Sequence, residues 1–172
     1  MTVVVFETHA TSEDNEAGIA TGWLGGALSP LGREQAAELG RRRRDDGIDA
    51  VYASDLWRAV QTAQIAFGDT QLPVVLDWRL RECDYGDWNG MPRARLDAER
   101  VDHVDAPWPG GESWSDAVAR VGSFLDELRG GRVVVIGHVA TRWALEHRVH
   151  GRTIEELAAE AFVWEPGWEY EL

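Results

Sequence analysis

A short apolar run near the start of the chain is followed closely by a histidine. Val3–Phe6 is bounded by polar residues, and His9 comes after only two of them. Runs of Val and Phe of this length are typical of a buried strand. In an open α/β sheet, such a strand delivers the next residues to the crevice at the carboxyl ends of the strands, where ligands bind. The pattern therefore predicts that His9 lies at a ligand-binding edge of a sheet.

The second half of the chain repeats this arrangement. Val133–Ile136 is another apolar run, and Gly137 and His138 follow it. Two histidines in matched positions after buried strands are expected to face one pocket, where imidazole can act as a nucleophile or move a proton. The alternative is that they are unrelated polar residues of two loops.

Helix and strand patterns alternate along the rest of the chain. This alternation predicts an α/β fold of three layers (α/β/α) with a mostly parallel central sheet, in a single domain over residues 1–172. Ser54, Ser113 and Thr153 are predicted N-caps. Helices are predicted over residues 31–44, 55–63, 113–129 and 141–149, and for a turn or two after Thr153. Further strands are predicted over 50–53 and 74–76, and a pair of short strands over 162–170. Residues 91–111 are predicted to be irregular.

Charge and cysteine content limit the classes of function. The 172 residues include 17 basic and 30 acidic side chains, a net charge of −13, which disfavours nucleic acids and anionic membranes as partners. Cys83 is the only cysteine, so no internal disulfide can form, and no His, Cys and Asp cluster has the spacing of a metal site. No apolar run approaches a membrane span and no signal peptide is visible at Met1, so the expected location is the cytoplasm.

Arg58 and Glu82 stand out among the charged residues. Arg58 lies near the start of the predicted helix after the 50–53 strand, where the helix N-terminus favours an anion and a guanidinium adds a bidentate fork. Glu82 lies in a loop, residues 80–90, that is rich in carboxylates and aromatic rings, and such surroundings can raise the pKa of a general acid. The alternatives are an exposed helix arginine paired with an acid, and an acidic surface loop.

Six segments of the chain follow the order of the motifs of a known family. They are Thr8–Asn15, Leu28–Ala36, Ser54–Ala63, Leu80–Gly90, Pro109–Ser113 and Val135–His138. In this order the chain resembles the histidine phosphatase superfamily, in the branch that contains cofactor-dependent phosphoglycerate mutases and small broad-specificity phosphatases. The resemblance covers nearly the whole chain and implies a phosphoglycerate mutase-like fold.

The resemblance also implies a role for each matched residue. His9 would be the nucleophile that forms a phosphohistidine, and Glu82 would protonate the leaving oxygen and then activate water. Two residues would hold the phosphoryl oxygens, Arg58 and His138, and two would make further contacts with the substrate, Asn15 and Tyr85. The resemblance implies no cofactor and no metal ion, because arginine and histidine can balance the phosphoryl charge.

The chain departs from the family pattern beside the nucleophile. The family's first arginine is Thr8 here, and the glycine after the nucleophile is Ala10. An arginine supplies a full charge and a bidentate fork, whereas Thr8 offers one hydroxyl to the substrate, so by analogy with arginine fingers the rate could fall roughly a thousandfold. Arg81 and Arg142 are the candidates to supply the missing charge to the substrate.

Two functions follow as alternatives. The first is a metal-independent phosphomonoester hydrolase acting on a small phosphorylated molecule. The mutases' Asn-Lys pair after the acid loop is replaced by Met91 and Pro92, which favours a phosphatase over a mutase. The second is a protein of this fold that binds a phosphorylated or other anionic ligand with little or no turnover. A homodimer is the candidate assembly.

Overall fold

The central sheet of the protein has five strands. In the computed structural model, which describes all residues 1–172, they are arranged in the order β4-β3-β6-β1-β7. Their bounds are β1 Thr2–Thr8, β3 Ala50–Ala53, β4 Val74–Leu76, β6 Gly131–Gly137 and β7 Trp168–Glu171. The first four strands along the chain in this sheet pair in parallel, whereas β7 runs antiparallel to β1. The sheet is therefore mixed but mostly parallel.

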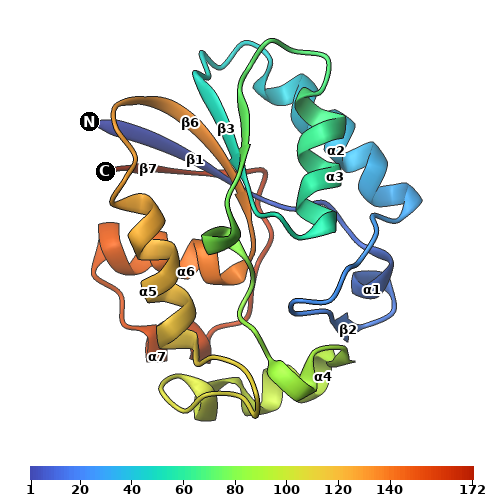
Figure 1. Cartoon of the computed structure of the whole chain (residues 1–172), viewed down its shortest axis with the longest axis vertical. Helices are drawn as coiled ribbons and strands as arrows, with labels where there is room; N and C mark the ends of the chain where they lie inside the picture. The colour runs from blue at the N-terminus through green and yellow to red at the C-terminus, as the bar shows by residue number, and fades with distance from the viewer.

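Helices cover both faces of this sheet (Figure 1). One face carries α2 Pro30–Arg43 and α3 Trp57–Phe67; the other carries α5 Trp114–Leu125 and α6 Val139–His150, with α7 Ile154–Ala159 beside α6. The predicted three-layer α/β fold is confirmed. None of the helices combines the length and the apolarity needed to cross a membrane.

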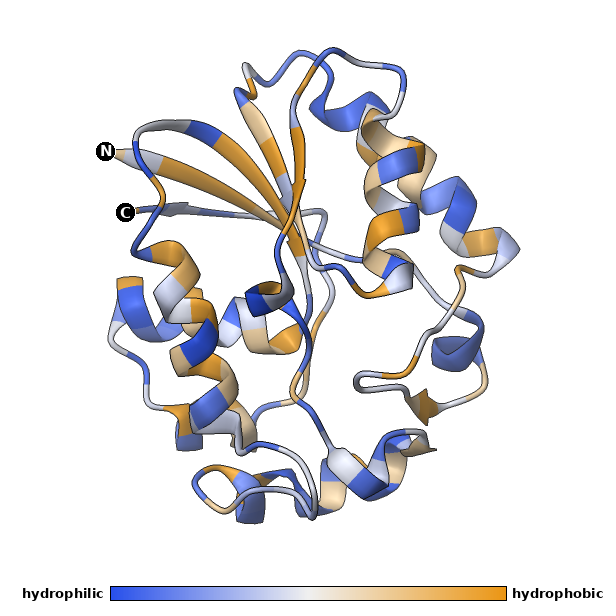
Figure 2. Cartoon of the chain, viewed as in Figure 1, coloured by the Kyte–Doolittle hydropathy of each residue, from blue (hydrophilic) through white to orange (hydrophobic).

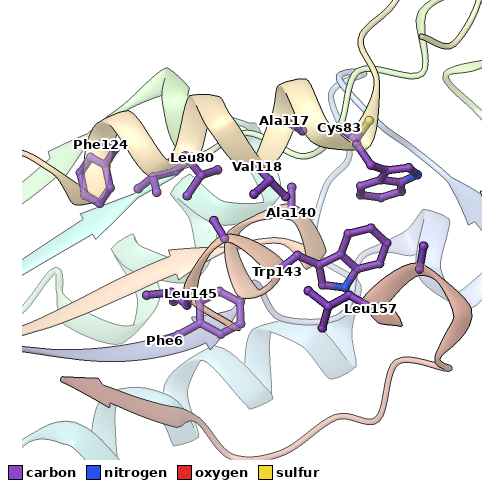
Figure 3. Close-up of a cluster of buried hydrophobic side chains, with 14 of the residues drawn as sticks. Phe6, Leu80, Cys83, Ala117, Val118, Phe124, Ala140, Trp143, Leu145 and Leu157 are labelled. Carbon is purple, nitrogen blue, oxygen red and sulfur yellow. The ribbon is translucent and has the colours of Figure 1, made fainter. Parts of the chain in front are cut away.

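Side chains of β1 divide between two cores, because successive residues of a strand point to opposite faces. Val4 and Phe6 belong to the larger apolar cluster, with α5 and α6, and Val5 belongs to the smaller one, with α2 and α3. All three are fully buried, which explains why the strand is a continuous apolar run and not an alternating pattern. Figure 2 shows these apolar strands enclosed by the helices, and Figure 3 shows part of the larger cluster.

Local capping signals set several helix starts. The side chains of Ser29, Ser113 and Thr153 accept hydrogen bonds from the backbone N–H of the third residue of α2, α5 and α7, respectively. The predicted N-caps Ser113 and Thr153 are thus confirmed. The prediction for Ser54 is wrong, because α3 begins later, with Leu56 as its N-cap. The Ser54 hydroxyl instead accepts a hydrogen bond from the Leu56 N–H in the turn that precedes the helix.

Two predicted segments differ from the structure. Residues 91–111 contain strand β5 Met91–Pro92, helix α4 Arg93–Glu99 and the 3₁₀ helix η3 Arg100–His103. α4 buries only Leu96 and carries i,i+4 ion pairs, so its apolar periodicity is too weak to predict a helix. Of the two strands predicted over 162–170, only β7 forms.

Small elements beyond the carboxyl ends of β1, β3 and β6 complete the fold (Figure 1). Strand β2 Ile19–Ala20 pairs with β5 as a separate two-stranded sheet, and α1 Glu13–Glu16 precedes it. The loop that carries Glu82 lies between the 3₁₀ helices η1 Trp78–Leu80 and η2 Gly86–Trp88. These elements supply side chains to the cleft described next.

Candidate active site

A cleft of about 540 Å³ opens where β1, β3 and β6 end. Its 19 lining residues include the four predicted catalytic residues, His9, Arg58, Glu82 and His138. They come from four places in the fold: the loop after β1, the first turn of α3, the loop between η1 and η2, and the N-cap of α6. A cleft of this size is typical of a site for a small molecule.

The two histidines are neighbours because β1 and β6 are neighbours. Thr8 at the end of β1 is in register with Gly137 at the end of β6, and the His9 N–H donates to the Gly137 carbonyl at 3.0 Å. The imidazole rings of His9 and His138 follow directly, with centroids 5.0 Å apart and planes inclined by 50°. One phosphoryl group can therefore contact both rings.

Hydrogen bonds assign a different tautomer role to each ring. His9 Nδ1 lies 2.7 Å from the Ala10 carbonyl oxygen, which can only accept, so Nδ1 carries the proton and Nε2 keeps a free lone pair. His138 Nδ1 lies 3.5 Å from an Arg58 guanidinium nitrogen, which can only donate. His138 Nε2 then carries the proton, and it is buried without a hydrogen-bond partner. The pair combines a free nucleophile with a free donor.

Both rings are neutral at physiological pH. Burial, together with the nearby Arg58 charge, lowers the pKa of His9 to about 3. Burial and the charge of Arg58 also hold the pKa of His138 well below its ordinary value. A neutral His9 is the form that can attack phosphorus.

Arg58 is held by neutral acceptors. Its guanidinium donates to the carbonyl oxygens of Gly22 at 2.8 Å and Leu24 at 3.3 Å, and the residue is 3% exposed. No salt bridge involves Arg58, so the structure does not support the alternative of an exposed arginine paired with an acid. Its positive charge is available to an anion in the cleft.

The Glu82 carboxylate lies at the N-terminus of α6. It accepts hydrogen bonds from the backbone N–H groups of Val139 at 3.3 Å and Ala140 at 3.2 Å, and from that of Cys83 at 2.9 Å. The first N–H groups of a helix lack intrahelical partners and favour a negative charge. This position brings a carboxyl group beside His138, the N-cap of the same helix.

A clamp of two side chains fixes the backbone that carries Glu82. Arg120 on α5 donates to the carbonyl oxygens of Arg79 at 2.7 Å, Arg81 at 3.1 Å and Glu82 at 3.1 Å. The Trp23 indole N–H donates to the same Glu82 oxygen at 2.6 Å. The Arg120 side chain is only 8% exposed, so these hydrogen bonds are shielded from water.

Three of the five predicted substrate-binding residues line the cleft: Thr8, Asn15 and Tyr85. The side-chain oxygen of Asn15 accepts from the Ser12 N–H in the capping box of α1, which leaves the amide N–H₂ free to donate. Tyr85 is buried edge-on against Trp108 and Trp114.

Arg81 and Arg142 lie outside the cleft, which corrects their predicted placement. Arg81 makes a bidentate pair with Asp55, with both contacts at 2.7 Å, and lies over the Trp23 ring. Arg142 lies over the Trp168 ring, 4.7 Å from its centroid. Ion pairing and stacking therefore engage both guanidinium groups away from the phosphoryl position.

Sequence reasoning missed several residues of the cleft. Arg93 on α4 is the one arginine besides Arg58 that lines it, and its Nε donates to Asp97 while its terminal nitrogens make no hydrogen bond. Phe162 and Trp164, from the segment predicted as a strand, also line the cleft. Arg93 and Asp97 are oppositely charged residues four positions apart, a spacing that is typical of a helix and could have indicated α4.

The structure offers no evident metal centre. No group of three or more His, Cys, Asp or Glu side chains is arranged to hold a metal ion. Cys83 has a free, buried thiol, and burial raises the pKa of this thiol. Its Sγ lies 3.8 Å from the carbonyl oxygens of Glu112 and Ser113.

Comparison with known proteins identifies the family. A 2,3-bisphosphoglycerate-dependent phosphoglycerate mutase of Methylobacterium sp. (strain 4-46) is 35% identical over 175 residues, covering 90% of this chain and 84% of that protein. The mycobacterial glucosyl-3-phosphoglycerate phosphatase, solved in complex with VO3, has a TM-score of 0.80 and 30% identity, covering 92% of this chain and 87% of that one. The α-ribazole phosphatase of Shigella flexneri has a TM-score of 0.79 and 25% identity, covering 90% and 83%. The family model of the histidine phosphatase superfamily (branch 1) matches residues 4–162, and the chain belongs to this family.

Proposed function

We propose that this protein hydrolyses phosphomonoesters of a small molecule through a phosphohistidine at His9, without a metal ion. The observation that carries the proposal is the neutral histidine pair: His9 has a free Nε2 lone pair beside the unpartnered, buried Nε2–H of His138. A phosphoryl group between them would have a nucleophile on one side and a donor to its oxygens on the other. Arg58 would supply the positive charge that phosphoryl transfer requires.

The reaction has two steps in this proposal. Glu82 enters the first step protonated, a form that the negative charge of the bound phosphate beside it favours. His9 Nε2 attacks phosphorus and the bond from phosphorus to the ester oxygen breaks, while Glu82 gives its proton to the leaving oxygen. Glu82 then takes a proton from water, whose oxygen attacks phosphorus and breaks the bond to His9, so that inorganic phosphate leaves and the histidine is regenerated. Arg58 and His138 hold the phosphoryl oxygens in both steps.

A hydrolase is favoured over a mutase. Proteins similar to this chain carry names of both kinds, a phosphoglycerate mutase and two phosphatases. A mutase must retain a substrate with two phosphoryl groups, which calls for a second strong anion site. Here Met91 and Pro92 form β5, and Arg93 is the single further arginine in the cleft. We therefore propose release of phosphate to water.

Thr8 supports a second candidate function, which is ligand binding with little turnover. With Thr8 in place of the family's arginine, and with Arg81 and Arg142 held elsewhere, only Arg58 lies beside the histidine pair as a cation. A phosphate ester could bind in this site and react slowly, because less charge is neutralised in the transition state.

Release of inorganic phosphate distinguishes these functions. The wild type and His9→Asn are compared on p-nitrophenyl phosphate and on alkyl phosphates, with a chelator present, and mutase activity is assayed with phosphoglycerates. The hydrolase proposal expects release by the wild type that His9→Asn abolishes. Tight binding of vanadate without any release would favour the binding function instead.

A further inference from the structure

The chain between α7 and β7 forms a strap, residues 161–167, that is fixed at both ends. Before it, Arg100 donates to the carbonyl oxygens of Ala158 at 2.9 Å and Glu160 at 2.7 Å. At its far end, Arg43 donates to the Pro166 carbonyl at 3.0 Å, and the same guanidinium pairs with the buried Glu7. In Figure 1 this connection is the red chain that runs from α7 to the sheet. The anchors hold the strap beside the cleft.

Two aromatic side chains of the strap line the cleft, Phe162 and Trp164. The Phe162 ring packs near the Trp168 ring, with centroids 6.1 Å apart, and near the Arg142 guanidinium, which lies 5.8 Å from its centroid. Trp164 differs from most tryptophans of this chain, because no aromatic ring and no arginine guanidinium of the protein stacks on it. The residue is also 59% exposed. Its indole face is therefore available to a ligand.

The cleft is much larger than a phosphoryl group needs, and part of its lining is apolar. Ile19, Leu96 and Val139 line it together with the two strap residues. Apolar and aromatic walls with a few polar groups favour a ligand that has an apolar face. An aromatic ring on such a wall gains stacking energy in addition to burial.

We propose that Phe162 and Trp164 bind the esterified group of the substrate, and that this group carries a planar aromatic ring. This inference rests on one part of the proposed function, namely that the phosphoryl group of the substrate is held at His9. The strap then determines substrate specificity. The histidine pair binds the phosphoryl group of any phosphomonoester, whereas Phe162 and Trp164 select esters whose alcohol part has a ring that stacks on Trp164.

Non-hydrolysable phosphonates test this without requiring turnover. Calorimetry measures binding of methylphosphonate, cyclohexylmethylphosphonate and 1-naphthylmethylphosphonate to the wild type, Trp164→Ala, Trp164→Phe and Val163→Ala. Val163 is the matched control, because it belongs to the strap, is 65% exposed and does not line the cleft.

The wild type should bind the naphthyl compound about tenfold more tightly than the other two. Trp164→Ala should lose most of this preference and keep its affinity for methylphosphonate. Trp164→Phe should retain much of the preference, and Val163→Ala all of it. Equal affinity for the cyclohexyl and naphthyl compounds, or an unchanged preference in Trp164→Ala, would overturn the proposal. Naphthyl-selective binding without hydrolysis of any phosphate ester would refute the proposed function and leave this inference standing.

Discussion

The rings of His9 and His138 lie 5.0 Å apart, each at the carboxyl end of one of two adjacent parallel strands. Burial and the Arg58 charge keep both of them unprotonated. Two neutral imidazoles at this spacing can act on one phosphoryl group, one as attacking nitrogen and the other as hydrogen-bond donor.

The histidine pair should make the protein less stable in mild acid. In the unfolded chain a histidine binds a proton below its ordinary pKa of about 6.5, whereas folded His9 stays neutral down to about pH 3. The unfolded state therefore binds more protons in this window, and stability falls as pH is lowered through it. His9 should contribute about 1.4 kcal/mol per pH unit in this window, roughly 2 kcal/mol by pH 5, and His138, whose pKa is also lowered, acts in the same direction.

Urea unfolding at pH 7 and pH 5 measures this effect. The doubly substituted variant His9→Asn, His138→Asn should lose clearly less stability between the two pH values than the wild type. His147→Asn, an exposed residue on α6, is the control and should behave as the wild type does. If wild type and double variant lose the same amount, the two histidines are not held neutral by the fold.

Glu82→Gln should slow hydrolysis of alkyl phosphates more than that of aryl phosphates. A poor leaving group needs its proton from an acid, whereas nitrophenolate leaves without one. General acid catalysis contributes about a hundredfold to ten-thousandfold, so the loss on an alkyl ester should fall in that range, with a much smaller loss on p-nitrophenyl phosphate.

Asp84→Asn is the matched control for the acid. Asp84 lies two residues away, does not line the cleft, and accepts hydrogen bonds from the Gly86 N–H and the Asn89 amide. Its substitution should change both substrate classes by the same small factor. Equal losses on alkyl and aryl esters in Glu82→Gln, with selective loss in Asp84→Asn, would identify Asp84 as the acid.

Arg120→Gln should weaken general acid catalysis by Glu82 while leaving the Glu82 carboxyl group in place. The guanidinium holds the carbonyls of Glu82 and Arg81 in the loop and that of Arg79 in η1, so its loss should let the Glu82 carboxyl group move relative to the leaving oxygen. We expect kcat for alkyl phosphates to fall about tenfold or more with little change in KM, and a smaller effect on aryl phosphates. Arg79→Gln removes surface ion pairs in the same region and should leave this ratio unchanged. An equal loss on both substrates would mean that Arg120 acts only on stability.

Local signals in the sequence predicted the parts of the fold that depend on local physics. The apolar runs of β1 and β6 and the caps Ser113 and Thr153 are of this kind. What the sequence left open depends on contacts between distant segments. Asp55 engages Arg81 across 26 residues, and Arg43 binds the Pro166 carbonyl of the strap across 123 residues. No short-range pattern indicates such pairings.

Thr8→Arg should raise phosphatase activity. Arg81 and Arg142, the two arginines expected to replace the missing charge, lie outside the cleft. An arginine at position 8 would therefore supply a positive charge that no other residue supplies there. Thr8 also lines a second cavity of about 340 Å³, which offers room for a guanidinium and contains the Glu34 carboxylate. Arg41 and Arg42 line the same cavity, and Glu38 is already paired with Arg41. We expect kcat/KM on an aryl phosphate to increase about tenfold or more, below the full effect of an arginine finger. Thr8→Gln, which adds bulk without charge, should give no gain. No gain in Thr8→Arg, with the fold intact, would indicate that the site already holds enough positive charge.

If His9 is the nucleophile, it becomes covalently phosphorylated during turnover, and this phosphohistidine can be trapped. The enzyme is mixed with a phosphate ester, quenched in alkali after milliseconds to preserve phosphoramidates, and analysed by mass spectrometry of the intact chain and its peptides. We expect one added phosphoryl group, located at His9, absent from His9→Asn and longer-lived in Glu82→Gln when an aryl phosphate is used. Steady release of phosphate with no modified chain at any time, or a phosphoryl group on another residue, would show that His9 is not the nucleophile.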